Sequence, residues 1–296
     1  MKTVCYLCRN PLRPFLHKNG YDVYACGSCG LKSTKLTVPY AQFINEFYTR
    51  GYFTGATSHG AYSNYALDEP YITRTMGKFL DKLKIIHPAT NGSTPKARLL
   101  DIGCAYGYFV EMALRAGYDA YGIDASAHAV NRAKQRLNGR IGEETLTSTT
   151  FPNKHFDLIT MLDVIEHLGD PRKDLQKVAN LLTDDGVVLI ATGDTDSIAA
   201  KILNRRWTFY IPPQHLFFYN RDNFSRLLAE SGLVPISWFR VGKWLSLQYV
   251  FHLARTTGES KIAQWLYPLM AALPLGRVPL YLSMRDNMVV IAKKKM

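Results

Sequence analysis

The feature that most constrains this chain is a glycine turn between a buried strand and a helix, in the stretch Leu99–Val110. The turn begins at Gly103 and ends at Gly107, and a second apolar strand ends in Asp124 about 20 residues later. Glycine lets the backbone approach a ligand closely, and an acid at the end of the second strand can accept hydrogen bonds from two ribose hydroxyls. This layout predicts a fold that binds a nucleotide-like ligand.

Strands and helices alternate from Lys96 onward, which predicts a parallel sheet covered by helices on both faces. We expect strands at 97–102, 119–123, 156–161 and 187–192, and helices at 107–116, 126–137, 171–182, 196–204 and 222–231. Pro171 suits a first helical turn, and Gly232 suits a helix end. Apolar residues at helical spacing predict a further helix from Asp68 to Ile86.

The turn 103–107 reads Gly-Cys-Ala-Tyr-Gly, not G-x-G-x-x-G, and Asp101 stands two residues before it. It resembles motif I of class I S-adenosylmethionine-dependent methyltransferases. Three further blocks resemble that family's later motifs, in the family's order: 121–126, 156–168 and 185–192. The resemblance implies a Rossmann-like α/β fold with a seven-stranded doubly wound sheet, which ends in an antiparallel pair at 237–241 and 287–292. Ala105 stands where the family usually has glycine, so we expect this residue to keep a negative φ.

The resemblance also implies which residues hold S-adenosylmethionine. Four residues match the family's contacts with the methionine end of the cofactor: Asp101, Gly103, Cys104 and Gly107. Six further residues match contacts with the ribose, the adenine and the end of the fourth strand: Asp124, Ala125, Thr145, Leu146, Leu162 and Asp163.

Two segments hold histidines that could act on the acceptor of the methyl group. The turn after the fourth strand resembles Glu-x-x-Glu-His of ubiquinone-pathway O-methyltransferases, whose polar residues bind a divalent metal, but here its first acid is Asp163. Glu166 and His167 are therefore candidates for metal binding, for general base catalysis or for capping the next turn. Segment 212–219 resembles the family's Pro-x-His-Leu-aromatic motif, which usually faces the acceptor. Its His215 is a candidate base or acceptor-positioning residue, or else a packed histidine in an aromatic run.

The N-terminal 40 residues hold four of the five cysteines, in two Cys-x-x-Cys pairs: Cys5, Cys8, Cys26 and Cys29. This spacing predicts a small ribbon whose four thiolates bind one structural zinc ion. Disulfides or free thiols are the alternatives, and a cytosolic chain argues against disulfides. His17 lies between the pairs, and we expect it to be a surface residue because four thiolates already satisfy zinc.

These features predict three parts of the chain: a zinc ribbon at 1–40, a helical segment at 41–95 and a methyltransferase domain at 96–296. The resemblance implies that the middle segment covers the cofactor. We expect an apolar, helical insertion at about 242–285 within the last part. This insertion either pads the core and the acceptor site or rests on a membrane surface.

The net charge of +12 is unevenly distributed along the chain. Residues 1–40 carry +5, residues 41–200 carry −3 and residues 201–296 carry +10. The basic ends are either a solvated surface or a sign of an anionic acceptor or a negatively charged surface. No stretch reaches the ~18 apolar residues that a membrane span needs, and no signal peptide is evident. We therefore expect a cytoplasmic protein without a transmembrane segment.

The acceptor is the least constrained part of the prediction. The order of ribbon, tyrosine-rich segment and core resembles bacterial methyltransferases of surface glycans and sugar-containing metabolites, which implies a small-molecule or glycan-like acceptor. RNA, a lipid or lipid-linked acceptor, and a protein that binds the cofactor without catalysis remain alternatives. Against RNA, the tyrosines do not interleave with lysines and arginines as in a surface that stacks bases.

Overall fold

The computed structural model describes residues 4–55, 64–88, 96–256 and 260–295. Its contacts divide the chain into two units. The ribbon unit comprises Met1–Thr75, Gly193–Asn223 and Val241–Asn287, and the sheet unit comprises Met76–Thr192, Phe224–Arg240 and Met288–Met296. Parts of the predicted cofactor-covering segment, 56–63 and 89–95, lie outside the described residues.

The sheet unit is built on seven strands in the order β10-β13-β8-β7-β4-β5-β6. Their bounds are β4 Arg98–Ile102, β5 Asp119–Asp124, β6 Ile141–Glu143, β7 Phe156–Leu162, β8 Leu182–Gly193, β10 Leu233–Phe239 and β13 Asn287–Lys294. Strand β4 pairs in parallel with both β5 and β7, whereas β10 and β13 are antiparallel. This arrangement confirms the predicted Rossmann-like fold class. The short strand β6 was not located from the sequence.

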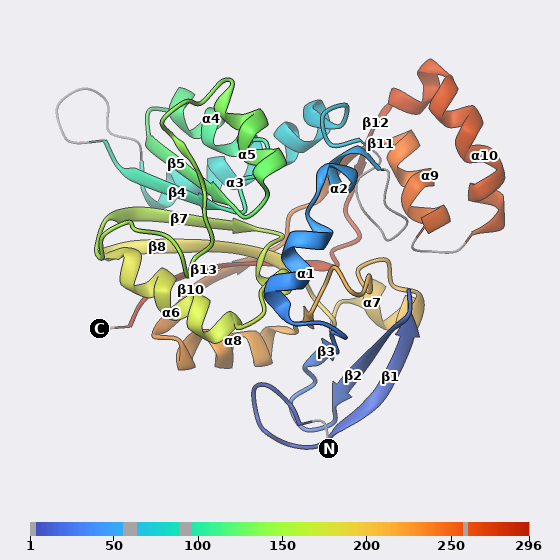
Figure 1. The fold of residues 1–296 in the computed structure, drawn as a ribbon, viewed down its shortest axis with the longest axis horizontal. Coiled ribbons are helices and arrows are strands. Elements are labelled where there is room, and N and C mark those ends of the chain that lie inside the picture. Colours follow the sequence, from blue (N-terminus) through green and yellow to red (C-terminus); the bar gives the residue numbers. More distant parts are fainter. Residues whose placement is uncertain (1–3, 56–63, 89–95, 257–259, 296) are drawn as a thin grey trace. The chain divides into compact units, whose positions relative to one another are not determined.

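Helices lie on both faces of this sheet, with α4 and α5 on one side and α6 and α8 on the other (Figure 1). Their bounds are α3 Glu69–Ile86, α4 Tyr108–Arg115, α5 Ala127–Lys134, α6 Pro171–Leu181 and α8 Arg221–Glu230. Helix α6 begins with Pro171, as the sequence predicted, because the first helical position does not need the backbone N–H that proline lacks. The Asp170 side chain caps this helix by accepting from the Lys173 amide, a contact that was not predicted. Central strand residues such as Leu99 and Leu158 are fully buried between the two helical layers.

The ribbon unit contains a four-stranded antiparallel sheet in the order β1-β2-β3-β9. Its bounds are β1 Leu12–Lys18, β2 Tyr21–Cys26, β3 Lys32–Thr34 and β9 Phe217–Phe218. Three short helices belong to the same unit: α1 Tyr40–Phe47, α2 Arg50–Thr54 and α7 Ile198–Leu203. A buried cluster packs Val23 of β2 against four side chains from the segment 200–218: Ala200, Trp207, Tyr210 and Phe218. The ribbon strands therefore share a core with residues about 200 positions away.

Residues 243–256 and 260–282 form two α-helices, a short 3₁₀ helix and a two-stranded hairpin in the ribbon unit. Their bounds are β11 Lys243–Ser246, α9 Leu247–Thr256, α10 Lys261–Ala272, η3 Pro274–Arg277 and β12 Pro279–Leu282. The sequence predicted helices here, but the hairpin of β11 and β12 was not predicted. Across the described residues, none of the helices has the length and apolarity to cross a membrane.

Candidate functional site

The predicted cofactor residues of the sheet unit gather where four neighbouring strands end. Asp101 lies near the end of β4, Asp124 ends β5 and Leu162 ends β7. Thr145 follows the end of β6, where its amide donates to the Ser148 hydroxyl at 2.8 Å. Because β7, β4, β5 and β6 are adjacent and parallel, their carboxyl ends form one edge. Such an edge is where open α/β sheets bind ligands, at the point where the strand order reverses.

The glycine turn after β4 has the left-handed backbone that glycine favours. The φ angles are +72° at Gly103 and +76° at Gly107. A Cβ on Gly103 would lie 2.5 Å from Val164 Cγ2, so this position excludes any side chain. Ala105 has a φ of 48°, so the expected negative φ at this residue is wrong. Its amide instead points at a carboxylate, which holds the residue in a conformation that alanine disfavours.

Asp124 fixes that turn through both carboxylate oxygens. Its Oδ2 accepts from the Ala105 amide at 2.8 Å, and its Oδ1 accepts from the Ser126 amide at 2.8 Å. Burial raises the pKa of Asp124, and the two amides oppose that rise. A carboxylate has about four lone-pair positions, so two acceptor positions remain for a ribose diol. The neighbouring Ala125 is exposed, as a residue at a ligand-facing edge can be.

Asp101 is buried beside the turn, and its Oδ1 accepts from the Thr160 hydroxyl at 2.6 Å. Burial raises the pKa of Asp101 to about 7, the Thr160 hydroxyl opposes the rise, and the charge of Asp124 adds to it. A buried carboxylate with a raised pKa is stabilised in its ionised form by a nearby cation. Asp101 therefore suits an ammonium group such as that of a bound amino acid moiety. Thr160 was not identified from the sequence, because a threonine in an apolar strand carries no visible signal.

Cys104 contributes its backbone to the turn, while its side chain is buried in the sheet unit. A Cβ added at Gly122 would lie 2.8 Å from the Cys104 sulfur, so the two residues fit closely together. Burial raises the pKa of this thiol well above its ordinary value, and the charges of Asp124 and Asp101 add to the rise. The thiol is therefore a packing group rather than a nucleophile. Leu146, the second predicted adenine contact, is also buried.

The segment after β7 is tied to the neighbouring strand β8. Asp163 has a φ of 55°, and its amide donates to the Ala191 carbonyl at 3.0 Å. A short 3₁₀ helix follows at Ile165–His167. Glu166 is fully buried, and its Oε2 accepts from the Thr192 hydroxyl at 2.9 Å. His167 is partly exposed, which leaves its side chain more accessible than that of Glu166.

His215 belongs to the ribbon unit and is buried there. Its Nδ1 lies 2.8 Å from the Phe209 carbonyl oxygen. A carbonyl only accepts, so Nδ1 carries the proton and the neutral ring has its lone pair on Nε2. The Phe209 ring lies 4.2 Å from the imidazole, measured between centroids. These contacts fix both the orientation and the tautomer of this histidine.

The loop that carries His215 is held by the ribbon strands. The Thr34 hydroxyl donates to the His215 carbonyl at 2.6 Å, and the Thr34 amide donates to the Leu216 carbonyl at 2.8 Å. The Asn19 side-chain amide donates to the Pro212 carbonyl at 2.7 Å. Strand β3 then pairs with β9 directly after the loop. Sequence reasoning missed this link, because contacts between residues nearly 200 positions apart leave no local pattern.

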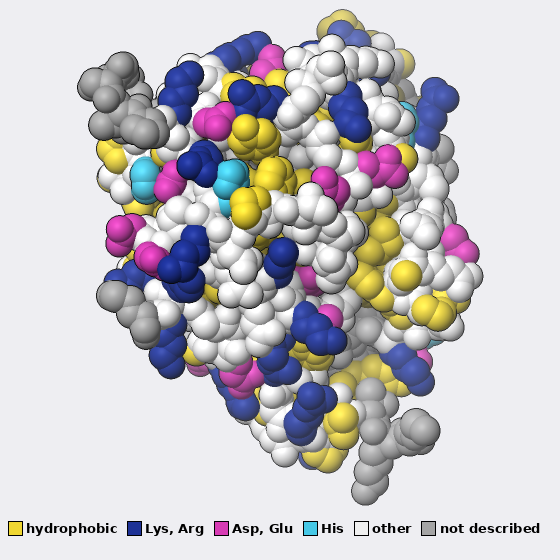
Figure 2. Space-filling model, turned by 60° about the vertical axis from the view of Figure 1, so that its left-hand side comes forward, with side chains coloured by type: hydrophobic (Ala, Val, Ile, Leu, Met, Phe, Trp, Pro, Cys, Tyr) yellow, Lys and Arg dark blue, Asp and Glu magenta, His cyan; other side chains and the backbone are white. Residues whose placement is uncertain are grey.

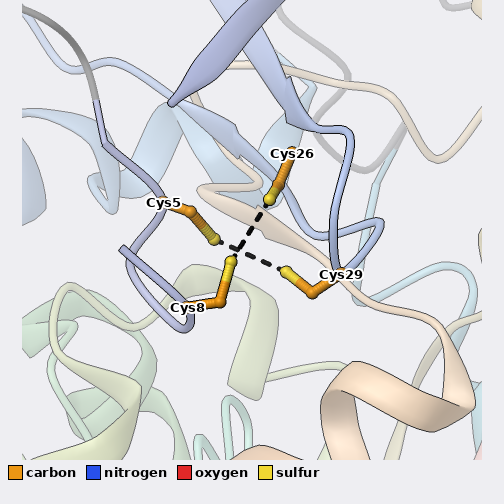
Figure 3. Close-up of side chains that lie close together, drawn as sticks. All are labelled: Cys5, Cys8, Cys26 and Cys29. Atoms are coloured by element: carbon orange, nitrogen blue, oxygen red, sulfur yellow. Dashed lines mark hydrogen bonds between the residues drawn. The ribbon is translucent and has the colours of Figure 1, made fainter. Parts of the chain in front are cut away.

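The four predicted zinc ligands converge in the ribbon unit (Figure 3). The Cys5 and Cys29 sulfurs are 3.6 Å apart, and the Cys8 and Cys26 sulfurs are 3.4 Å apart. Tetrahedral zinc with Zn–S bonds of about 2.3 Å places its sulfurs about 3.8 Å apart, so the cluster fits such an ion. The structure joins none of these four cysteines in a disulfide. The side chain of His17 is 67% exposed and pairs with Asp22, which confirms it as a surface residue.

The second cysteine pair is anchored to the start of helix α8. The Asn223 side-chain amide donates to the Cys29 carbonyl at 3.1 Å. The Asn220 and Asn223 side-chain oxygens each accept from the other residue's backbone amide, at 2.9 and 3.1 Å, which caps the helix. The link from this cap to the cysteine cluster was not foreseen from the sequence, because it joins residues 194 positions apart.

Charged side chains are interspersed on the surface (Figure 2). On the face shown there, the lysine and arginine side chains of the described residues are dispersed among acidic and uncharged groups. Among the described residues, Arg172 forms an ion pair with Glu230, and Lys154 forms one with Asp184. Exposed pairs of this kind contribute little to stability, with a typical value below about 1 kcal/mol. On the face shown in Figure 2, the basic side chains are therefore dispersed rather than gathered into one patch.

A family model described as a methyltransferase domain matches residues 72–237, which is more than half of the chain. Among curated relatives, the ubiquinone biosynthesis O-methyltransferase of Glaesserella parasuis serovar 5 is 34% identical over 121 residues. That match covers 38% of this chain and 51% of the relative, so the chain spans about half of the relative's length. A Cereibacter sphaeroides protein of the same name is 27% identical over 183 residues, covering 54% of this chain and 74% of the relative.

Two solved structures share the fold. One is the Burkholderia thailandensis 1,6-didemethyltoxoflavin-N1-methyltransferase with bound 1,6-didemethyltoxoflavin and S-adenosylhomocysteine. It has a TM-score of 0.55 at 14% identity and covers 96% of this chain and 100% of that one. The YcgJ protein of Bacillus subtilis has a TM-score of 0.50 at 19% identity, covering 75% of this chain and 99% of that one. At these identities the likeness establishes the fold alone.

Proposed function

The chain belongs to the methyltransferase domain family, and from this premise we propose that it transfers a methyl group from S-adenosylmethionine to a hydroxyl group of a small-molecule acceptor. The observation that carries the proposal is the pair of carboxylates beside the glycine turn. Asp101 suits the cofactor's ammonium, and Asp124 suits its ribose diol. The relatives named O-methyltransferases favour oxygen as the accepting atom.

The protein's task in this reaction is mainly alignment. When bound, S-adenosylmethionine supplies a methyl group on a sulfonium, which is already an activated leaving group. Residues that hold the reactants in line can then supply much of the rate enhancement. In our proposal Gly103, Gly107 and Asp124 position the cofactor. Leu162 and Asp163 contact it from the carboxyl end of β7.

A hydroxyl acceptor also needs a base, and we assign this role to His215. Its Nδ1 donates to the Phe209 carbonyl, so the lone pair on Nε2 is the one that can accept a proton. An imidazole titrates near neutral pH, which suits general base catalysis. His167, in the 3₁₀ helix after β7, is the competing candidate. The proposal also includes one structural zinc ion on the four clustered cysteines.

The cofactor assignment is tested by calorimetric titration of the full chain with S-adenosylmethionine. Asp124→Asn removes the charge but keeps one acceptor oxygen, and it should weaken binding by roughly tenfold or more. Asp185→Asn, which changes an exposed acid on β8, is the matched control and should bind like the parent. Equal affinities for all three proteins would refute the role of Asp124, and binding of NAD in place of S-adenosylmethionine would refute the cofactor.

The base is tested by turnover with a panel of phenolic, sugar and nucleoside acceptors. His215→Asn places a side-chain amide where Nδ1 donates to Phe209, but it removes the Nε2 lone pair. Turnover should fall by about 10²–10⁴-fold, while cofactor affinity should stay nearly unchanged. If His167→Asn shows this loss and His215→Asn does not, His167 is the base. Cofactor binding without product from any acceptor would support a protein that binds the cofactor without catalysis.

A further inference from the structure

Helix α10 presents an apolar stripe to solvent. Ile262, Trp265 and Leu269 are 72%, 79% and 50% exposed. Their spacing of three and four residues places them on one face of the helix, one above the other. An exposed tryptophan between two exposed aliphatic residues is unusual on a helix, because most helices bury their apolar face.

The opposite face of α10 is already used for packing. Ala263 and Met270 are buried, and Tyr267 lies under the Arg255 guanidinium of α9, 3.6 Å from the ring centroid. The Tyr267 hydroxyl also lies 3.5 Å from the Gln248 side-chain amide of α9. Figure 1 shows the two helices side by side. The inward face of α10 therefore packs against α9, and the apolar stripe on the opposite face points to solvent.

The exposed apolar surface continues beyond the helix through η3 and β12. Further large apolar side chains there are exposed: Leu273, Leu275, Val278, Tyr281, Leu282 and Met284. Gly276 lets this segment fold back closely, since a Cβ there would lie 1.9 Å from the Met270 carbonyl oxygen. Of the 17 exposed large apolar side chains among the described residues, nine lie between 262 and 284. A concentration of this kind marks an interaction site.

The charges in this segment indicate the kind of partner. Residues 261–285 contain Lys261, Arg277 and Arg285 and no aspartate or glutamate. All three basic residues are exposed. Two copies of this surface facing each other would bring like charges together, which is costly. An anionic lipid surface instead attracts each basic group while its acyl region takes up the apolar side chains.

We propose that α10, η3 and β12 form a membrane-docking surface for a bilayer that contains anionic lipids. The helix has 12 residues and therefore a length of about 18 Å, so it would lie in the plane of the interface rather than cross it. Trp265 suits the headgroup level, where aromatic side chains concentrate. This surface goes beyond the methyl-transfer function and does not depend on it. It also differs from the alternative in which the insertion only pads the core.

The proposal is tested by co-sedimentation of the full chain with vesicles. Vesicles of phosphatidylcholine with an equal share of phosphatidylglycerol should bind the parent protein, and pure phosphatidylcholine vesicles should bind it far more weakly. Trp265→Ser with Leu269→Ser should reduce binding by about tenfold or more. Lys261→Gln with Arg277→Gln should reduce binding to the anionic vesicles by roughly fivefold for each charge removed.

A matched control replaces two exposed apolar residues elsewhere in the ribbon unit. Ile198→Ser with Ile202→Ser removes side chains on α7 that are as exposed as Ile262, and it should leave vesicle binding unchanged. Equal binding to both vesicle types, or equal losses from the α7 and α10 variants, would overturn the proposal. A second pair of results would also overturn it. These are a parent protein that does not bind vesicles, and light scattering that shows a parent dimer which dissociates in the variant with Trp265→Ser and Leu269→Ser.

Discussion

The turn after β4 and the cysteine cluster are both predicted ligand sites, but different forces shape them. Around the turn, Val164 leaves no room for a Cβ at Gly103, and Asp124 accepts hydrogen bonds from two backbone amides. Fully buried strands surround it. Around the cysteines, four thiols meet in a ribbon of short strands that shares its core with distant segments. The protein's own core thus shapes the turn in advance, whereas in our proposal a zinc ion completes the ribbon.

The difference concerns where the free energy of each region comes from. Burial of apolar strands stabilises the sheet unit whether or not a ligand is bound. A cluster of four thiolates without a cation is electrostatically unfavourable, so binding of the proposed zinc ion would be part of the folding free energy of the ribbon. Five predictions test this distinction, in order of decreasing effect.

Removal of zinc should have the largest effect, because structural zinc contributes on the order of 10 kcal/mol to small metal-dependent folds. Elemental analysis should find about one zinc per chain in the parent, and this zinc should be absent from Cys26→Ser with Cys29→Ser. Hydrogen exchange should then rise in β1–β3 and at 212–219, while β4 and β7 stay protected. Cys104→Ala, which changes the cysteine outside the cluster, should keep its zinc. If β4 also lost protection from hydrogen exchange, the stability of the turn after β4 would depend on the metal as well.

A side chain at Gly103 should destabilise the sheet unit by several kcal/mol. The added Cβ would lie 2.5 Å from Val164 Cγ2 at a φ of +72°. Gly139→Ala is the matched control, because Gly139 has a φ of +74° with nothing within 4 Å. The control should cost only the conformational term of about 1–2 kcal/mol, and Gly103→Ala should cost about 1–3 kcal/mol more. Equal urea midpoints for the two variants would mean that the turn is not sterically constrained.

Cofactor affinity should depend on pH through Asp101, whose pKa is raised to about 7 by burial. A bound ammonium favours the ionised carboxylate, so affinity should fall by about tenfold for each pH unit below 7 and level off above it. Equilibrium dialysis between pH 5 and 8.5 measures this profile, and Asp101→Asn should flatten it.

The same proton affects folding in the opposite direction. The folded-state pKa of Asp101 lies above its ordinary value of 3.8, so the folded protein binds the proton more tightly than the unfolded chain. The contribution of this group to the free energy of unfolding should therefore decline as pH rises from about 4 to 7. If the Asp101→Asn variant is no more stable than the parent at pH 8, both measured without cofactor, this expectation is wrong.

Ala105→Gly should give the smallest effect. At a φ of 48°, alanine costs about 1–2 kcal/mol relative to glycine, but glycine adds about 0.4–1 kcal/mol of entropy to the unfolded chain. The variant should therefore be more stable by about 0.5 kcal/mol, measured by urea denaturation. A less stable variant would indicate that the alanine methyl group makes a packing contact that offsets its backbone strain.

The parts of this structure that the sequence predicted are those with local signals. Alternation of apolar runs and helical periods located β4, α4, β5 and β7 to within a few residues. The four cysteine sulfurs lie together in the structure, as the Cys-x-x-Cys spacing predicted. The conformation of Ala105 was predicted wrongly, because the Asp124 carboxylate 19 residues away determines it. Similarly, the support of the His215 loop by Thr34 depends on tertiary contacts that no local pattern encodes.

The pairing of β3 with β9 has a consequence for synthesis of the chain. Ser33 pairs with Phe217, which is made 184 residues later. At about 5–20 residues per second, a ribosome needs about 10–40 s to supply that partner. During this interval the nascent ribbon displays an open strand edge, which other chains can join. If the four cysteines bind zinc before residue 217 is made, the short strand β3 would be held rigidly beside the metal site. We therefore expect the zinc supply during translation to influence how much of the protein aggregates.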